Sequence, residues 1–285
     1  GVMVQAIEKD YYVTMLLRLL AQRMPYIVFK GGTSLSKCHK VIRRFSEDID
    51  ITIDTLLSQG QKKKIKQAIV ESAEELGMTI ENLDETRSRR DYNRYVIAYD
   101  SVIPMASDAL KAAVLLETSY TAVSFPTVLL PVHSYIGDMM EQEAPDAIEE
   151  YNLNPFEMKV QGIDRTLADK VFAVCDYYLQ GKVAKHSRHL YDIYKLLPLV
   201  PQDENFKELV KEVRAVREQS VICPSALPEA NVPELLEKII KEKAYKQDYD
   251  SLTMQLLEEN VPYDTVIAAL KQIAGGAMFD NTYGG

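Results

Sequence analysis

Hydrophobic and polar residues along the first half of the chain follow two different periods. Apolar residues spaced three and four apart predict helices over residues 5–23 and 59–78. Alternation, or short apolar runs rich in β-branched residues, predicts strands. The expected strands cover residues 26–30, 48–53, 92–100, 112–120 and 128–136. We therefore expect the N-terminal part of the chain to mix helices with about five strands.

Past residue 160 the pattern becomes helical throughout. Asp164 is placed to cap a helix over residues 165–180. Further helices are expected over residues 187–197, 203–218, 232–244, 247–259 and 262–273, with prolines between several of them. The change of pattern predicts an α/β domain over residues 1–155 and a helical domain over residues 156–285.

Composition and charge narrow the class of protein. The 285-residue chain is 47% hydrophobic and 26% charged, as is ordinary for a globular protein. It contains no membrane-length apolar run and no signal-peptide pattern, and its three cysteines are scattered. We expect a cytoplasmic protein with no membrane partner and no zinc site.

A net charge of −9 argues against non-specific coating of nucleic acid, but the basic residues cluster. The clusters lie at residues 37–44, 62–66, 87–94 and 182–188. Each is either a solvated face or a local binding site for an anion. For RNA, the best candidates are Arg87, Arg89, Arg90 and Arg94 beside Tyr92 and Tyr95, and Lys182, Lys185 and Arg188.

Two aspartates occupy alternate positions in the strand "DIDITI". In a strand, residues two apart point to the same face, about 6.5–7 Å apart along the backbone. Asp48 and Asp50 therefore project together, while Ile49, Ile51 and Ile53 face the core. The pair is either a polar outer face or a pair of hard oxygen ligands for Mg²⁺.

A double glycine precedes this strand by one short helix. Gly31 and Gly32 end the strand "YIVFK", and Thr33 is placed to cap a helix over residues 34–42. Glycines let a ligand approach the backbone closely, and a helix start attracts phosphate. The turn is either a simple connection or a phosphate cradle next to the aspartate strand.

These motifs together resemble a known family. "FKGGTSLSK" followed, after a rather long spacer, by "RFSEDIDI" is similar to the AbiEii/AbiGii nucleotidyltransferase toxins, relatives of the MenT toxins. The resemblance implies an α+β fold: a nucleotidyltransferase-like mixed sheet with helices, followed by a helical bundle. It covers residues 29–197, and no motif covers the helical tail after residue 200.

The resemblance also implies roles for particular residues. Asp48 and Asp50 would bind metal and act in catalysis with Lys170 and Asp192. Glu117, in a neighbouring expected strand, is a candidate third carboxylate or a solvated strand residue. The implied nucleotide-binding residues are Gly31, Gly32, Thr33, Ser34, Lys37, Ser46 and Arg188. The alternative for Lys170 is a solvated helix residue. The alternative for Arg188 and Asp192 is a simple surface pair four residues apart.

The implied activity is Mg²⁺-dependent transfer of a nucleotide from an NTP to an acceptor such as the 3′ end of tRNA. Such an enzyme would be the toxin of a bacterial toxin–antitoxin or phage abortive-infection system, with a cognate antitoxin as partner. Two alternatives stay open. One is a transferase of the same fold acting on an antibiotic or a protein, and the other is a non-catalytic module that binds a nucleotide or a partner.

Overall fold

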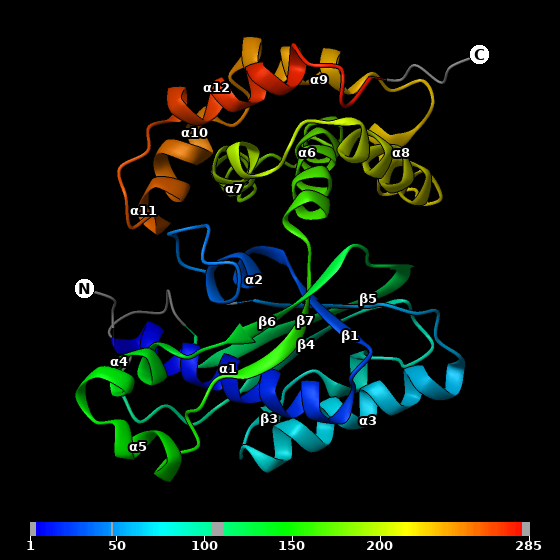
Figure 1. Ribbon diagram of the computed structural model, residues 1–285. Coiled ribbons are helices and arrows are strands. Elements are labelled where there is room, and N and C mark those ends of the chain that lie inside the picture. Colours follow the sequence, from blue (N-terminus) through cyan, green and yellow to red (C-terminus); the bar gives the residue numbers. More distant parts are fainter. Residues whose placement is uncertain (1–3, 47, 104–110, 281–285) are drawn as a thin grey trace. The chain divides into compact units, whose positions relative to one another are not determined.

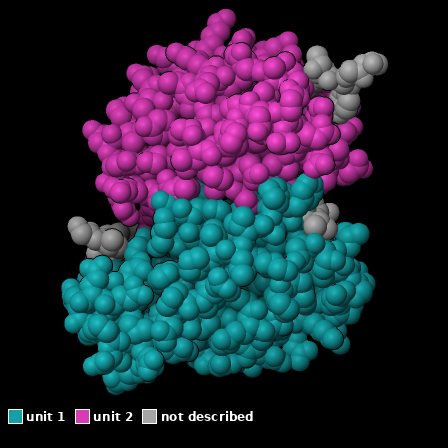
Figure 2. Space-filling model, in the orientation of Figure 1, with its two compact units in different colours: residues 1–40, 46–161 teal, residues 41–45, 162–285 magenta. Residues whose placement is uncertain are grey.

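The chain forms two compact units. The structure is a computed structural model that describes residues 4–46, 48–103 and 111–280. The first unit comprises residues 1–40 and 46–161, and the second comprises residues 41–45 and 162–285 (Figure 2). The sequence boundary was expected at residue 155, whereas the units divide after residue 161 and the stretch 41–45 belongs to the second unit.

A seven-stranded mixed sheet forms the centre of the first unit (Figure 1). Its strands, in spatial order, are β3 (Thr79–Ile80), β4 (Tyr92–Ala98), β5 (Ala113–Val123), β2 (Ile49–Ile53), β1 (Ile27–Lys30), β7 (Phe156–Gln161) and β6 (Thr127–Val132). The central strands β2 and β5 are parallel, as are β1 and β7, and the other neighbouring pairs are antiparallel. The expected mixed sheet with helices is confirmed.

Helices cover both faces of this sheet. Figure 1 shows α1 (Val4–Arg23) and α3 (Gln59–Glu75) on one face and α2 (Gly31–Lys37) on the other. The apolar stripes of α1 and α3 pack with Ile49, Ile51 and Ile53 in one core. Burial of alternate strand residues on this face leaves Asp50 of the same strand for the opposite face.

Two local predictions in the first unit are wrong. Thr33 does not cap a helix over residues 34–42, because α2 begins at Gly31 and Thr33 lies inside it. The predicted strand over residues 128–136 ends at Val132, because Ser134 accepts a hydrogen bond from the Gly137 N–H and caps α4 (Tyr135–Glu143). The sequence prediction missed β3, β7, α4 and α5 (Pro145–Glu150).

The second unit is helical. It contains α6 (Ile163–Leu179), α7 (Arg188–Leu196), α8 (Glu204–Glu218), α9 (Val232–Glu242), α10 (Lys246–Asp248), α11 (Met254–Leu256) and α12 (Tyr263–Ala274). Short 3₁₀ turns lie at Leu83–Glu85 in the first unit and at Leu197–Leu199 and Pro224–Ala226 in the second. No helix in the described ranges has the length and apolar character needed to cross a membrane.

Two helix predictions in the second unit need correction. Gly162, not Asp164, occupies the N-cap of α6, and the Asp164 side chain accepts from the Arg165 N–H in the first turn. The helix expected over residues 247–259 is divided, because a π-helical turn at Tyr249–Thr253 separates α10 from α11.

The stretch Val41–Phe45 pairs with the end of α11. Arg44 forms a β-bridge with Leu257, and the Phe45 N–H donates to the Leu256 carbonyl over 2.9 Å. Because residues 40 and 46 belong to the first unit, the chain crosses between the units on both sides of this stretch.

Candidate nucleotidyl-transfer site

The glycine turn and the aspartate strand are in direct contact. Gly31 has a φ of +79°, and a Cβ added there would lie 2.0 Å from Oδ2 of Asp50. Any side chain at this position would therefore collide with the carboxylate, and an L-residue would also strain the backbone. Lys30, just before the turn, is the antiparallel register partner of Asp50. The short motif thus brings the turn and the carboxylate to one point.

Asp48 carries an unsatisfied buried oxygen. Its Oδ1 atom is buried and makes no hydrogen bond with any described residue. A buried, unpaired carboxylate oxygen costs free energy, and a cation would remove that cost. Asp50, in β2, and Asp48, just before the first residue of β2, offer the hard oxygen donors that Mg²⁺ prefers. The donor set therefore fits the metal that the sequence implied.

No third acidic ligand joins this pair in the described part of the chain. The residues that the structure describes contain no group of three or more His, Cys, Asp and Glu side chains placed to hold a metal. Glu117 is the register neighbour of Asp50 across β2 and β5, but its carboxylate lies 3.6 Å from Nε of Arg94 on β4. Glu117 therefore pairs with Arg94 while its side chain stays partly exposed.

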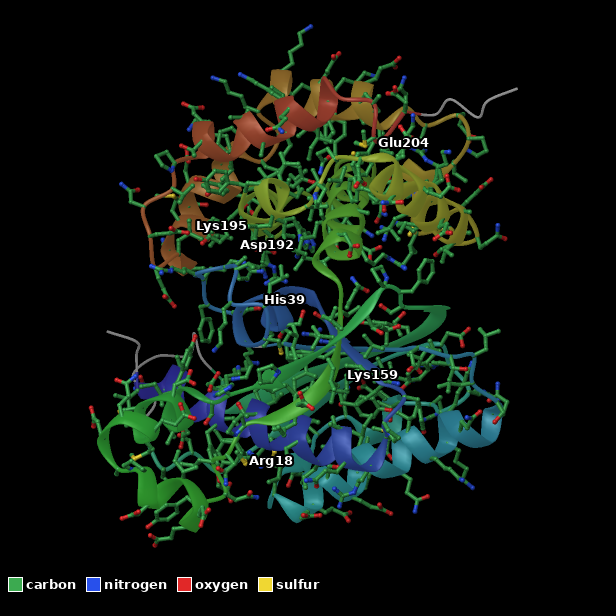
Figure 3. The ribbon with its side chains drawn as sticks, in the orientation of Figure 1. Arg18, His39, Lys159, Asp192, Lys195 and Glu204 are labelled. Carbon is green, nitrogen blue, oxygen red and sulfur yellow. The ribbon has the colours of Figure 1, made fainter. Side chains whose placement is uncertain are left out.

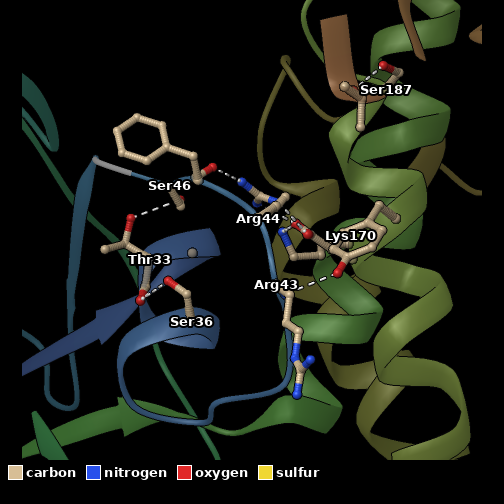
Figure 4. Close-up of polar contacts among 12 residues, drawn as sticks. Thr33, Ser36, Arg43, Arg44, Ser46, Lys170 and Ser187 are labelled. Carbon is tan, nitrogen blue, oxygen red and sulfur yellow. Dashed lines mark hydrogen bonds and ion pairs between the residues drawn. The ribbon is translucent and has the colours of Figure 1, made fainter. Parts of the chain in front are cut away.

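The polar residues of α2 are bonded within the first unit. The Thr33 and Ser46 hydroxyls lie 2.9 Å apart (Figure 4). The Ser34 hydroxyl donates to the Gly31 carbonyl over 2.9 Å. Lys37 is buried and forms an ion pair with Asp10. The Thr33–Ser46 bond ties α2 to the residues just before Asp48, so these hydroxyls hold the two parts of the motif together.

The second unit holds a buried charge cluster around Asp192. Asp192 lies on α7 (Figure 3) and is fully buried. Its carboxylate accepts from Nε of Arg44 at 2.7 Å and from a terminal guanidinium nitrogen at 2.8 Å, and Lys170 on α6 lies 2.6 Å away (Figure 4). Burial alone would raise the pKa of Asp192, but Arg44 and Lys170 outweigh it and hold that pKa well below its usual value.

Arg44 was not among the predicted site residues. It lies in the basic cluster 37–44 and is the first residue of the "RFSEDIDI" part of the motif. Its partner Asp192 is 148 positions away in the chain. Arg188, for which a surface pair with Asp192 was the alternative to nucleotide binding, is half-buried. The Asp192 carboxylate itself pairs with Arg44 and Lys170.

The basic cluster at residues 87–94 lies at the surface of the first unit. Arg87, Arg89, Arg90 and Arg94 are exposed. Of the two tyrosines, Tyr92 is 52% exposed, whereas Tyr95 is 1% exposed and packs in the core. Tyr95 is thus unavailable to any ligand, because alternate residues of β4 face opposite sides of the sheet.

The fold is that of a nucleotidyltransferase toxin. MenT4, a nucleotidyltransferase toxin from Mycobacterium tuberculosis H37Rv, is similar in structure with a TM-score of 0.52 at 16% sequence identity. The similarity covers 95% of this chain and 83% of that chain.

A family comparison identifies the chain more closely. The family described as nucleotidyl transferase AbiEii toxin, type IV toxin–antitoxin system, matches residues 15–270. The chain therefore belongs to the AbiEii nucleotidyltransferase toxin family, which confirms the resemblance inferred from its motifs. A comparison with curated proteins found no match.

Proposed function

We propose that this chain is the toxin of a bacterial toxin–antitoxin system and transfers a nucleotide from an NTP to RNA, with a tRNA 3′ end as the acceptor. Membership of the AbiEii family supports the toxin and transferase classes. The observation that carries the chemical proposal is the orphaned Oδ1 of Asp48 beside the Asp50–Gly31 contact. Both substrates are cytoplasmic, and we place the protein there, with a cognate antitoxin that restrains it.

In this proposal Asp48 and Asp50 hold Mg²⁺. The bound metal would neutralise the triphosphate and favour in-line attack. The absence of a side chain at Gly31 lets the phosphates approach the backbone next to Asp50. The acceptor hydroxyl loses its proton to solvent as its oxygen bonds to the α-phosphorus, the bond to the bridging oxygen breaks, and pyrophosphate leaves. Such a displacement depends mainly on positioning and electrostatics.

We assign Asp192 a positioning role in place of a proton-accepting one. A carboxylate whose pKa is held well below its usual value by two cations is a weak base. Its charge holds Lys170 and Arg44 in place. Burial lowers the pKa of Lys170, although the negative charge of Asp192 acts to raise it. Lys170 and Arg188 keep the roles that the family resemblance implies, in catalysis and in nucleotide binding respectively. Contact of Lys37 with phosphate would require its ion pair with Asp10 to open.

The test is transfer of label. The protein is incubated with each α-labelled NTP, Mg²⁺ and total tRNA, with a chelator in the control. We expect one or more NTPs to label the RNA only when Mg²⁺ is present. If a protein or a small molecule is labelled instead, the proposed transferase activity stands but RNA is not the acceptor. Absence of label from all four NTPs, on any acceptor, would overturn the proposal.

A further inference from the structure

A row of side chains extends from the aspartate strand across two more strands of the sheet. Asp50 on β2 is the register partner of Glu117 on β5, and Glu117 is the register partner of Arg94 on β4. Register partners point to the same face of a sheet. Tyr92, two residues before Arg94, also points to this face. The face that carries the candidate metal ligands therefore continues onto β4.

Glu117 is held from two sides but remains accessible. Arg94 lies 3.6 Å from one of its oxygens, and the Tyr92 hydroxyl donates a hydrogen bond to the carboxylate. The Glu117 side chain is still 36% exposed and that of Arg94 53% exposed. Partial burial, with the charge and hydrogen bond of Glu117, raises the pKa of Tyr92 to about 12. The phenol is therefore a protonated donor at neutral pH and keeps its bond to Glu117.

This bond fixes the orientation of an exposed aromatic ring. Tyr92 is anchored through its hydroxyl, while half of the residue faces solvent. A ring held in this way offers a flat apolar face whose position is set before a ligand binds. Aromatic rings of this kind stack on unpaired bases, and the base–aromatic contact tolerates different sequences.

We propose that Tyr92, Glu117 and Arg94 form a nucleobase subsite beside the carboxylate pair. Strand β4 lies two strand spacings, about 9.5 Å, from β2. That is a span which a single nucleotide bridges from a phosphate near Asp50 to a base on Tyr92. The inference rests on the proposed nucleotidyl transfer and adds to it the residues that recognise the base. The base is that of the NTP or that of the RNA end.

The charges of the subsite favour particular bases. A carboxylate accepts hydrogen bonds from an exocyclic amino group, as Glu and Asp do from N4 of cytosine. Arg94, five N–H donors on a planar group, can donate to a ring nitrogen or carbonyl of the same base. Uracil has no amino group to offer Glu117. The subsite therefore prefers a base that carries an amino group. Cytosine and uracil are the most closely matched pair of bases with which to test this preference.

The test measures binding to two probes in the presence of Mg²⁺. The first probe is the non-hydrolysable α,β-methylene analogue of CTP, compared with that of UTP, and the second is total tRNA. Tyr92→Ala removes the ring, and Tyr92→Phe keeps the ring but removes the hydroxyl. Tyr151→Ala is the matched control, because Tyr151 is another exposed tyrosine (61%) of the same unit and lies just after α5. Circular dichroism checks that each variant is folded.

We expect Tyr92→Ala to weaken the binding of one of the two probes about 10-fold or more. Tyr92→Phe should weaken it less, and Tyr151→Ala should bind both probes as wild type does. The weakened probe identifies the source of the base. If that probe is the nucleotide, Glu117→Gln should bring the CTP and UTP analogues closer in affinity, because an amide also donates.

The outcomes separate this inference from the proposed function. If wild type binds the probes and Tyr92→Ala binds both with affinities within about twofold of the wild-type values, the subsite alone is overturned. Loss of binding that is equal in Tyr92→Ala and Tyr151→Ala would also overturn it. Wild type that binds neither probe would overturn the proposed function, and the subsite with it.

Discussion

Replacement of Asp192 by asparagine should strongly destabilise the helical unit. The substitution removes the negative charge between Arg44 and Lys170, whose side chains are only 2% and 7% exposed. Two cations would then be buried without a counter-charge. Breaking a buried ion pair by removing one partner costs about 3–5 kcal/mol. With a urea dependence of about 2 kcal/mol per molar, the midpoint of unfolding should fall by about 1.5–2.5 M.

The assay is urea unfolding at neutral pH, followed by circular dichroism. Asp250→Asn is the control, since Asp250 forms an exposed pair with Lys246 in the same unit and its replacement should change the midpoint little. The pKa of Asp192 is depressed in the folded protein, so its contribution to stability is present above about pH 4 and is lost as the pH falls further. The gap between wild type and Asp192→Asn should therefore narrow at acid pH.

A second variant distinguishes structural from catalytic roles of the cluster. The triple change Arg44→Met, Lys170→Met and Asp192→Leu removes all three charges together. Apolar replacement of a whole buried cluster is often neutral or stabilising. We expect the triple variant to recover much of the stability that Asp192→Asn forfeits, but not the transfer of label. An Asp192→Asn protein within about 1 kcal/mol of wild type would refute the reasoning, because the buried cations would then not depend on this carboxylate.

Two further predictions concern the first unit. Gly31→Ala and Gly77→Ala both place a side chain at a positive φ, at a cost in stability of about 1–2 kcal/mol each. Only Gly31→Ala should also abolish labelling. Its Cβ collides with Asp50, whereas nothing lies within 4 Å of a Cβ at Gly77. Equal labelling by the two variants in parallel assays would disprove the close approach. Neutralising Arg87, Arg89 and Arg90 together should weaken tRNA binding and flatten its salt dependence by about one unit of log–log slope for each phosphate group that the protein no longer neutralises, while binding of NTP persists. Unchanged RNA affinity across a salt titration would remove this cluster from the interface.

Features that depend on local alternation were predictable from the sequence. The pattern of "DIDITI" assigned Ile49, Ile51 and Ile53 to the core, and the structure confirms it. The double glycine marked a turn beside a strand, and the structure places Gly31 against Asp50. The mixed α/β composition of the first part of the chain and the helical composition of the second followed from the same periodicities.

Features that depend on distant partners were not predictable. Thr33 has the chemistry of a helix cap, but its hydroxyl lies against Ser46 instead, and the helix starts at Gly31. Arg44 is one charge among several in a basic cluster of the sequence, because its partner Asp192 is 148 positions away. Both cases show a tertiary contact that overrides a local preference.

The same reason explains why the surroundings of two candidate residues could not be predicted from the sequence. The position of Lys37 after the glycines predicts a phosphate ligand, yet its partner Asp10 comes from the preceding helix α1. Tyr95 lies near Tyr92 in the sequence, although the two tyrosines face opposite sides of the strand. Local position identified the motif, whereas the partners of each side chain required the fold.

Label transfer from an α-labelled NTP to RNA shows whether Asp48 and Asp50 support metal-dependent nucleotidyl transfer. Wild type, Asp48→Asn and Asp50→Asn are compared at equal concentration across a Mg²⁺ titration, with circular dichroism to verify folding. We predict labelling by wild type and a loss of at least about 100-fold in each variant, as expected when a preorganised charge at the reacting centre is removed. Folded Asp48→Asn and Asp50→Asn proteins that label RNA as well as wild type would contradict the account.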